Sequence, residues 1–275
     1  QDIAAHTFHA RTEAANRAKL EALLKDTATS VHGKRAILRV MLNMGAPEDL
    51  EPVAACLTPP ETRDWAAALL AGTPGKAAAR CLTRTLQSPD PALRVTALNA
   101  LAIRRDAAAV APATADRDPA VAAAAFAALG RIGDTDALKA LAKPAAAAYE
   151  PARLRALAAC IGTLSDQGQA RATVRAAKPI FTETSHPAAV RAAAARALLL
   201  ADSRFFEFGI KDASPLVRQT VIRAADGVPV DVLAGALKTV APSEQVMLAA
   251  KLASRGDASA ADAVAALLTS DQEAV

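Results

Sequence analysis

Clusters of positively charged side chains are the residues of this chain that point most directly to chemistry, and that chemistry would be anion binding. Within each cluster the charges lie three or four residues apart, as in Lys76, Arg80 and Arg84, in Lys139 and Lys143, and in Arg171, Arg175 and Lys178. In a helix this spacing places each cluster on one face. Such a basic stripe would attract an acidic protein surface, an anionic glycan or nucleic acid.

The alternative for the basic stripe is a solvated face without a ligand. Acidic residues concentrate at the predicted starts of helices, as at Asp90, Asp118 and Asp134, whereas basic residues fall in later turns. The helix dipole favours this distribution whether or not a ligand binds. Both interpretations remain open from the sequence.

A second group of arginines follows proline within three or four residues at a regular interval. Its members are Arg63, Arg94, Arg155, Arg191 and Arg218. Because they share the period of the sequence, we expect them to form a row along the molecule. The row could bind a series of phosphates or carboxylates, but the preferred interpretation is structural. Each arginine would pair with a carboxylate that caps a helix of its own repeat or of a neighbouring one.

An aromatic cluster is formed by Phe205, Phe206 and Phe208. Neighbouring side chains of one helix cannot all face inward, so one of them is a candidate exposed anchor for a partner. The alternative is that the cluster fills a core made thin by alanine. Trp65 and Tyr149 are the only large aromatics with a polar edge, and this lack of stacking platforms makes nucleic acid an unlikely partner.

The elements that must position these residues are predicted from a period of about 30 residues. A proline recurs at this interval, most clearly at Pro91, Pro119 and Pro215, and is followed by an alanine-rich apolar run. The preceding Asp or Ser is a helix cap, proline suits the first helical position, and the apolar spacing of three and four marks a buried helical face. Looser copies begin at Pro60, Pro151, Pro187 and Pro242.

Two helices per repeat follow from this pattern, because a second apolar run comes after each short break. We predict a leading helix near residues 10–25, helix pairs over residues 31–270, and one continuous array across 1–275. The alanine run at residues 145–148 is also predicted to be helical. The long interval after Pro151 predicts an extended second helix around residues 171–181.

Composition supports an all-α fold with a core of small side chains. The 275 residues are 52% hydrophobic and 3% aromatic, which favours closely stacked helix pairs. Cys56, Cys81 and Cys160 lie in apolar runs and are interpreted as buried core residues. The net charge of +4 permits an acidic partner without requiring one. No apolar run is long enough to span a membrane.

The residues Asp118-Pro-Ala-Val-Ala-Ala-Ala-Ala-Phe-Ala-Ala-Leu-Gly-Arg-Ile-Gly-Asp134 resemble HEAT repeats of the short, phycobilin-lyase type, and the resemblance extends over nearly the whole chain. It implies a right-handed α-solenoid of about eight HEAT-like helix pairs, whose second helices line a concave face. The basic stripe would then lie on that face. Ala122 departs from the pattern, because it stands where the other repeats have arginine.

The resemblance implies a function in binding rather than chemistry. We expect a non-catalytic protein-interaction scaffold, or an accessory domain of a larger exported bacterial protein, whose partner is another protein or another domain of the same chain. One alternative is a bilin-lyase-like or other ligand-holding factor, and a lower alternative is anion or nucleic-acid binding through the basic stripe. Because the chain begins at Gln1, we expect a processed precursor or a segment of a longer protein, and an exported location is slightly favoured.

Motifs of enzymes are not found in the sequence. The four histidines, His6, His9, His32 and His186, are scattered, and none is followed by glutamate, so the His-Glu metal motifs of HEAT-repeat deoxyhypusine hydroxylases are absent. His6 and His9 lie one helical turn apart, but an exposed terminal helix explains them more simply. The sequence therefore predicts no catalytic residue, no metal and no cofactor, and it predicts that the chain is not an enzyme.

Overall fold

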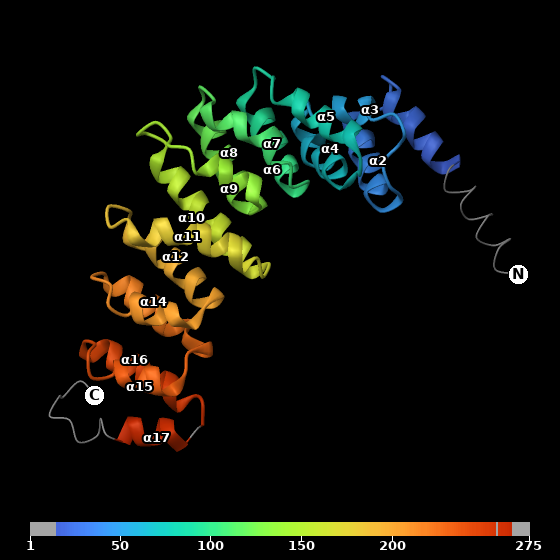
Figure 1. The fold of residues 1–275 in the computed structure, drawn as a ribbon. Coiled ribbons are helices and arrows are strands. Elements are labelled where there is room, and N and C mark those ends of the chain that lie inside the picture. The colour runs from blue at the N-terminus through green and yellow to red at the C-terminus, as the bar shows by residue number, and fades with distance from the viewer. Residues whose placement is uncertain (1–14, 257, 266–275) are drawn as a thin grey trace, which may run out of the picture. The chain divides into compact units, whose positions relative to one another are not determined.

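A computed structural model of the chain describes residues 15–256 and 258–265, and each regular element in these residues is a helix (Figure 1). Residues 15–25 form the first described helix. The first helices of the successive pairs are longer and comprise α2 (Val31–Met44), α4 (Pro60–Gly72), α6 (Pro91–Ile103), α8 (Pro119–Ile132), α10 (Glu150–Asp166), α12 (Ala188–Ala201), α14 (Pro215–Arg223) and α16 (Pro242–Ala253).

The second helices are mostly shorter. They comprise α3 (Glu51–Ala55), α5 (Lys76–Thr85), α7 (Ala107–Val110), α9 (Thr135–Leu141), α11 (Ala170–Thr182), α13 (Phe206–Gly209), α15 (Val230–Ala236) and α17 (Ala258–Ala265). Short 3₁₀ segments, η1 (Ala111–Ala115), η2 (Ser203–Phe205) and η3 (Ala225–Gly227), extend some of the connections. The predicted all-α fold of helix pairs is confirmed, and α11 is the extended second helix that the long interval predicted.

The described residues group into two compact units. The first contains residues 15–132 together with 143–153, and the second contains residues 133–142 together with 154–256 and 258–265. In the first unit α2 packs on α4, α4 on α6, and α6 on α8. In the second unit α11 packs on α12, α12 on α14, and α14 on α16. Within each unit, successive pairs therefore contact one another, as in an α-solenoid.

Helix starts follow the predicted chemistry at several repeats. Before α6, the side chain of Asp90 accepts a hydrogen bond from the N–H of Ala92 at 2.9 Å, and Pro91 occupies the first helical position. At α14 the arrangement differs, because Ser214 makes no side-chain cap. The N–H of Ser214 instead donates to the carboxylate of Asp212 at 2.8 Å. The acceptor therefore lies two residues before the position next to proline, where the sequence pattern placed the cap.

Small residues allow the helices to approach closely. In the second unit Phe206 is 1% exposed and lies in a core with Val217, Val221 and Leu248. A Cβ added at Gly209 would lie 2.6 Å from Cγ1 of Val221, so the glycine is needed where α13 meets α14. Cys56, Cys81 and Cys160 are buried, as predicted.

One predicted helix is wrong. Residues 142–149 contain the alanine run and form bends and turns between α9 and α10. The N–H of Ala145 donates to the carboxylate of Glu150, and the N–H of Tyr149 donates to the carbonyl of Ala146 at 2.8 Å. These contacts hold the segment as the lead-in to α10, and alanine propensity alone does not override them.

Candidate interaction surfaces

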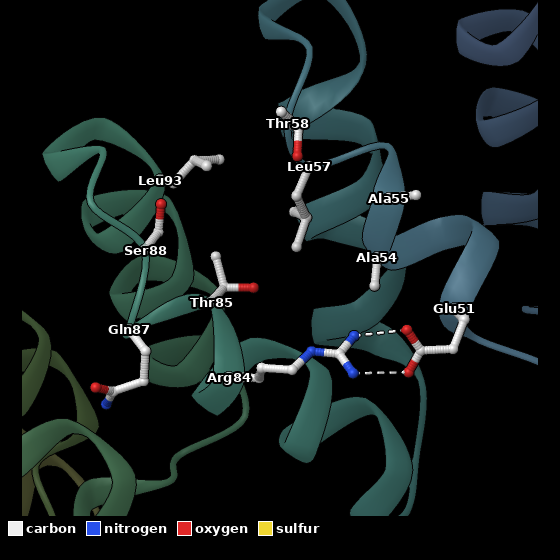
Figure 2. A pocket seen from close by; sticks show the side chains of 10 residues that line it. All are labelled: Glu51, Ala54, Ala55, Leu57, Thr58, Arg84, Thr85, Gln87, Ser88 and Leu93. Atoms are coloured by element: carbon white, nitrogen blue, oxygen red, sulfur yellow. Dashed lines mark hydrogen bonds and ion pairs between the residues drawn. The ribbon is translucent and has the colours of Figure 1, made fainter.

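The three basic clusters of the sequence lie in three different environments. On α5, Arg84 donates from Nη1 and Nη2 to the two carboxylate oxygens of Glu51 on α3, at 3.0 and 2.6 Å (Figure 2). Both side chains are largely exposed. The hydrogen bond from Arg84 holds the pKa of the Glu51 carboxyl below its ordinary value. This cation is therefore already neutralised by a residue of the neighbouring repeat.

Hollows lie on both sides of the Arg84–Glu51 pair. One has a volume of about 370 Å³, and its lining includes Leu57, Thr85 and Leu93 (Figure 2). The other has a volume of about 470 Å³ and includes Asp49 and Arg80. Acidic and basic groups thus share this region, so α5 does not present a uniformly positive face.

The second basic cluster is divided by the end of α9. Lys139 lies in the last turn and pairs with Asp136 of the first turn, with 2.7 Å between Nζ and Oδ1. Because α9 ends at Leu141, Lys143 lies in the connection beyond the helix. The predicted common helical face of Lys139 and Lys143 is therefore wrong.

The third basic cluster lies on α11, and its charges are not neutralised. Arg171, Arg175 and Lys178 are all exposed, while Thr173 and Ala177 are buried on the opposite side of the helix. The helix contains no acidic residue. Within residues 15–256 and 258–265, no carboxylate forms an ion pair with any of the three cations. Of the three clusters, the one on α11 keeps all of its cations free of ion pairs in the described residues, whereas on α5 Lys76 and Arg80 are exposed and Arg84 is bound to Glu51.

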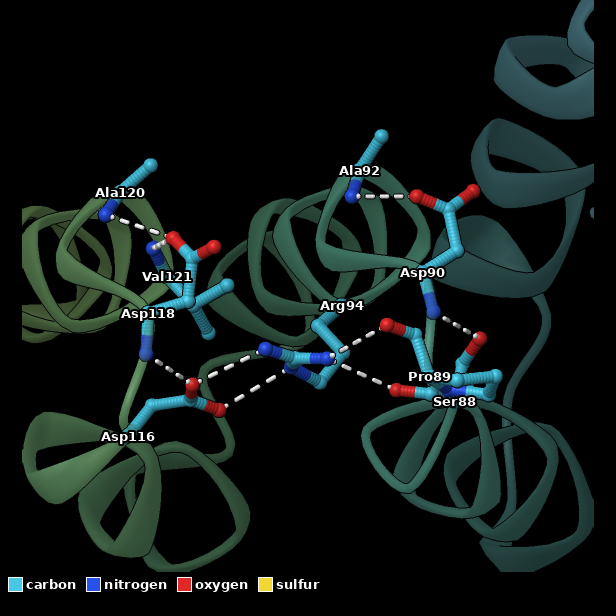
Figure 3. A network of polar contacts seen from close by, with 9 residues as sticks. All are labelled: Ser88, Pro89, Asp90, Ala92, Arg94, Asp116, Asp118, Ala120 and Val121. Carbon is cyan, nitrogen blue, oxygen red and sulfur yellow. Dashed lines mark hydrogen bonds and ion pairs between the residues drawn. The ribbon is translucent and has the colours of Figure 1, made fainter.

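Four of the five repeating arginines occupy one structural position, the fourth residue of a first helix. Arg94 of α6 shows the arrangement most fully (Figure 3). Its Nε and Nη2 donate to the two carboxylate oxygens of Asp116, each at 3.0 Å, and Nη1 donates to the carbonyl of Ser88 at 2.8 Å. The Arg94 side chain is 6% exposed, so its donors are used within the fold.

Similar pairs join other successive repeats. The pairs are Arg63 with Asp90, Arg191 with Asp212, and Arg218 with Glu244. Each carboxylate also accepts a backbone N–H near the start of the next pair, as Asp116 accepts that of Asp118 at 2.8 Å. Burial raises the pKa of the Asp116 carboxyl, but the hydrogen bonds from Asp118 and Arg94 outweigh burial and leave the pKa below its ordinary value. We call these three pairs, together with Arg94–Asp116, the arginine–carboxylate ladder.

Arg155, which the sequence spacing assigned to the row, is exposed. The fourth residue of α10 is Arg153, because the helix begins at Glu150, one residue before Pro151. Arg153 is buried, and its Nε donates to Glu150 at 2.8 Å. Ala122 and Gln245 occupy the same position in α8 and α16. Arg153 follows Pro151 by two residues, whereas Arg94 follows Pro91 by three, so the recurring spacing did not identify it.

The three phenylalanines differ in exposure. Phe206 is buried, whereas Phe208 is 64% exposed and Phe205 is half-buried. The rings of Phe205 and Phe208 lie 6.1 Å apart with an interplanar angle of 50°. Edge-tilted contacts of this kind hold aromatic rings in a defined orientation.

The remaining candidates are the histidines, the cysteines and Trp65. In the described part of the chain, no group of three or more histidine, cysteine or acidic side chains could hold a metal. His32 is exposed, and His6 and His9 lie outside the described residues. Burial raises the pKa of the Cys160 thiol to about 12, which keeps it protonated and unreactive. Trp65 is half-buried, with the guanidinium carbon of Arg39 5.3 Å from its ring centre.

No described helix is both long and apolar enough to cross a membrane. The helices of the described residues define an all-helical protein of stacked pairs. No protein-family profile matches the chain, and no curated protein matches it. The resemblance to HEAT repeats is thus supported by the fold but not by a family match.

Solved structures with a similar arrangement of helices include human deoxyhypusine hydroxylase in complex with glycerol, at 17% identity and a TM-score of 0.42, covering 98% of this chain and 94% of that one. An engineered protein is 20% identical with a TM-score of 0.37, covering 67% and 97%. The complex of CpcE and CpcF of phycocyanin lyase from Nostoc sp. is 18% identical with a TM-score of 0.39, covering 81% and 96%. Sequence identities and TM-scores this low do not indicate a shared activity.

The prediction that the chain is not an enzyme needs correction. Two of these similar structures are named as a hydroxylase and as part of a lyase. A chain of stacked helix pairs is therefore not excluded from enzymatic activity by its architecture. The likeness assigns no reaction to this chain.

Proposed function

We propose that the chain is a helical-repeat scaffold that binds another protein, or another domain of a longer chain, through the second unit. The observation that carries this proposal is Phe208, which is 64% exposed and in ring contact with the half-buried Phe205. The core at this position is filled by Phe206. Aromatic side chains, phenylalanine among them, are enriched in protein–protein interfaces relative to the rest of the surface. The proposal concerns binding and leaves catalysis open.

The test is affinity capture of partners from the cells that make the protein, with mass spectrometry of what is retained. Changing Phe208 to Ser should reduce recovery of a stoichiometric protein partner at least about tenfold, as loss of an aromatic anchor does. Ile103→Ser is the matched control, because Ile103 is an equally exposed apolar residue of the first unit, at 68% against 64%. Equal recovery with both variants, or no protein partner at all, would overturn the proposal.

A second candidate function is the holding of a small ligand such as a bilin. It is favoured by the hollow of about 370 Å³ beside the Arg84–Glu51 pair, a size within the range of ligand sites. Polar groups there are already used, since Thr85 donates to the carbonyl of Cys81 at 2.9 Å and Ser88 accepts the N–H of Asp90 at 3.1 Å. We therefore rank this function second. A shift in visible absorbance when bilin is added would support it, and an unchanged spectrum would count against it.

A further inference from the structure

The net positive charge of the chain is concentrated in one segment. Residues 167–201 contain five basic residues and one acidic residue, so their formal charge is +4, equal to that of all 275 residues. The basic residues are Arg171, Arg175, Lys178, Arg191 and Arg196, and the acidic residue is Glu183. Arg191 is buried against Asp212, whereas the three cations of α11 are exposed. The rest of the chain is formally neutral.

The fold does not account for the charges of α11. Arg171 is the second residue of this helix, where the positive end of the helix dipole disfavours a cation, and the first turn contains no acid. By contrast, α9 has Asp136 in its first turn and Lys139 in its last turn, as the dipole favours. On α11 neither the dipole nor an ion pair offsets the repulsion between the cations.

The three cations form a short, continuous row. Their spacing of four and three residues places them on one helical face, over a length of about 10 Å. This face lies opposite buried Thr173 and Ala177, so it points away from the packing surface of α11. Two of the three side chains are arginines, which can hold a carboxylate through two parallel hydrogen bonds.

We propose that this face of α11 binds an acidic polypeptide segment whose carboxylates recur at three- and four-residue intervals. Because the row is positively charged, its partner must be negatively charged. The row contains three cations, so it can pair with about three carboxylates. Nucleic acid fits less well, because Phe181, the aromatic residue of α11, packs against the core of the second unit and leaves no ring on the basic face for stacking. This site is separate from the Phe205–Phe208 pair, so each proposal can fail without the other.

Fluorescence anisotropy with the full chain tests the inference. The probe is a labelled alanine-based peptide with glutamates at i, i+4 and i+7, and the control peptide has glutamines at those positions. We expect the glutamate peptide to bind more tightly than the control, and its affinity to fall at least about tenfold between 50 and 300 mM salt. Equal affinity for the two peptides would overturn the inference, as would tighter binding of single-stranded DNA of the same charge.

Variants locate the site on α11. Replacing Arg171, Arg175 and Lys178 together with glutamine should weaken binding of the glutamate peptide about tenfold. The matched control replaces Lys76 and Arg80 of α5, which are also exposed. The α11 variant should melt at or slightly above the wild-type temperature, because it removes an unfavourable charge from the first turn. Equal weakening by both variants would show non-specific attraction and overturn the site.

Discussion

At the scale of single residues, the ladder converts recurring charges into links between repeats. Arg94 is almost fully buried, and its guanidinium donates to Asp116 and to the carbonyl of Ser88. Asp116 in turn accepts the N–H of Asp118, whose carboxylate caps α8 through Ala120. The Arg94–Asp116 pair therefore holds the connection between α6 and α8. The bond from Arg94 to Ser88 also holds the end of the connection between α5 and α6.

Asp116→Asn should destabilise the chain by about 3 kcal/mol, because it leaves the guanidinium of Arg94 buried without a counter-charge. Urea denaturation followed by circular dichroism measures the loss. The control is Glu51→Gln, which breaks a pair of the same chemistry on the surface and should change the unfolding midpoint little. Equal losses from the two variants would show that the ladder does not stabilise the fold.

The pH dependence of stability should reveal the same pair. Since the pKa of the Asp116 carboxyl is lowered in the folded chain, its stabilising effect is fully present above the unfolded pKa and is lost as pH falls through the folded pKa. The difference in unfolding free energy between wild type and Asp116→Asn should therefore be constant near neutral pH and shrink below about pH 4. A difference that stays constant down to pH 3 would contradict this assignment.

At the scale of elements, the start of each helix decides which arginine is buried. Because α10 begins at Glu150, Arg153 points inward and Arg155 outward. Arg153→Ala should cost about 1–2 kcal/mol, since it removes a buried, charge-assisted contact with Glu150. Arg155→Ala should leave the unfolding midpoint nearly unchanged. A larger loss of thermal stability from Arg155→Ala than from Arg153→Ala would indicate that α10 begins at Pro151.

Short helices depend on close contact with their neighbours, because a helix of one turn is not stable alone. At Gly209, Ala should cost about 1–3 kcal/mol, since its Cβ would collide with Val221. At Gly162, inside α10, an added Cβ meets nothing within 4 Å, so the same substitution should be neutral or stabilise by about 0.5–1 kcal/mol. Parallel thermal melts compare the two, and similar shifts would contradict the described contact of α13 with α14.

At the scale of the whole molecule, the sequence predicted the class of fold because its period carries the information. Proline at or beside the helix start and apolar residues three and four apart recur in the pairs from α4 onward, so one local rule describes most of the chain. The rule failed where a local contact competes, as at residues 145–148, which the Glu150 carboxylate holds outside a helix.

The interaction surfaces could be predicted only in part. The sequence identified all three basic clusters, but Glu51 lies 33 residues before Arg84, and its role in neutralising that cation follows from tertiary packing. The sequence also indicated that one phenylalanine would be exposed, without showing which one. Such outcomes depend on where neighbouring repeats place their acids and cores, and this information is not contained in helical spacing.

Hydrogen–deuterium exchange of the chain, alone and with its captured partner, would show whether the second unit binds protein. We expect slower exchange at residues 203–211, around the Phe205–Phe208 pair, when the partner is bound. Unchanged exchange there, with protection confined to α3 and α5, would contradict the proposed function and assign binding to the hollows beside the Arg84–Glu51 pair.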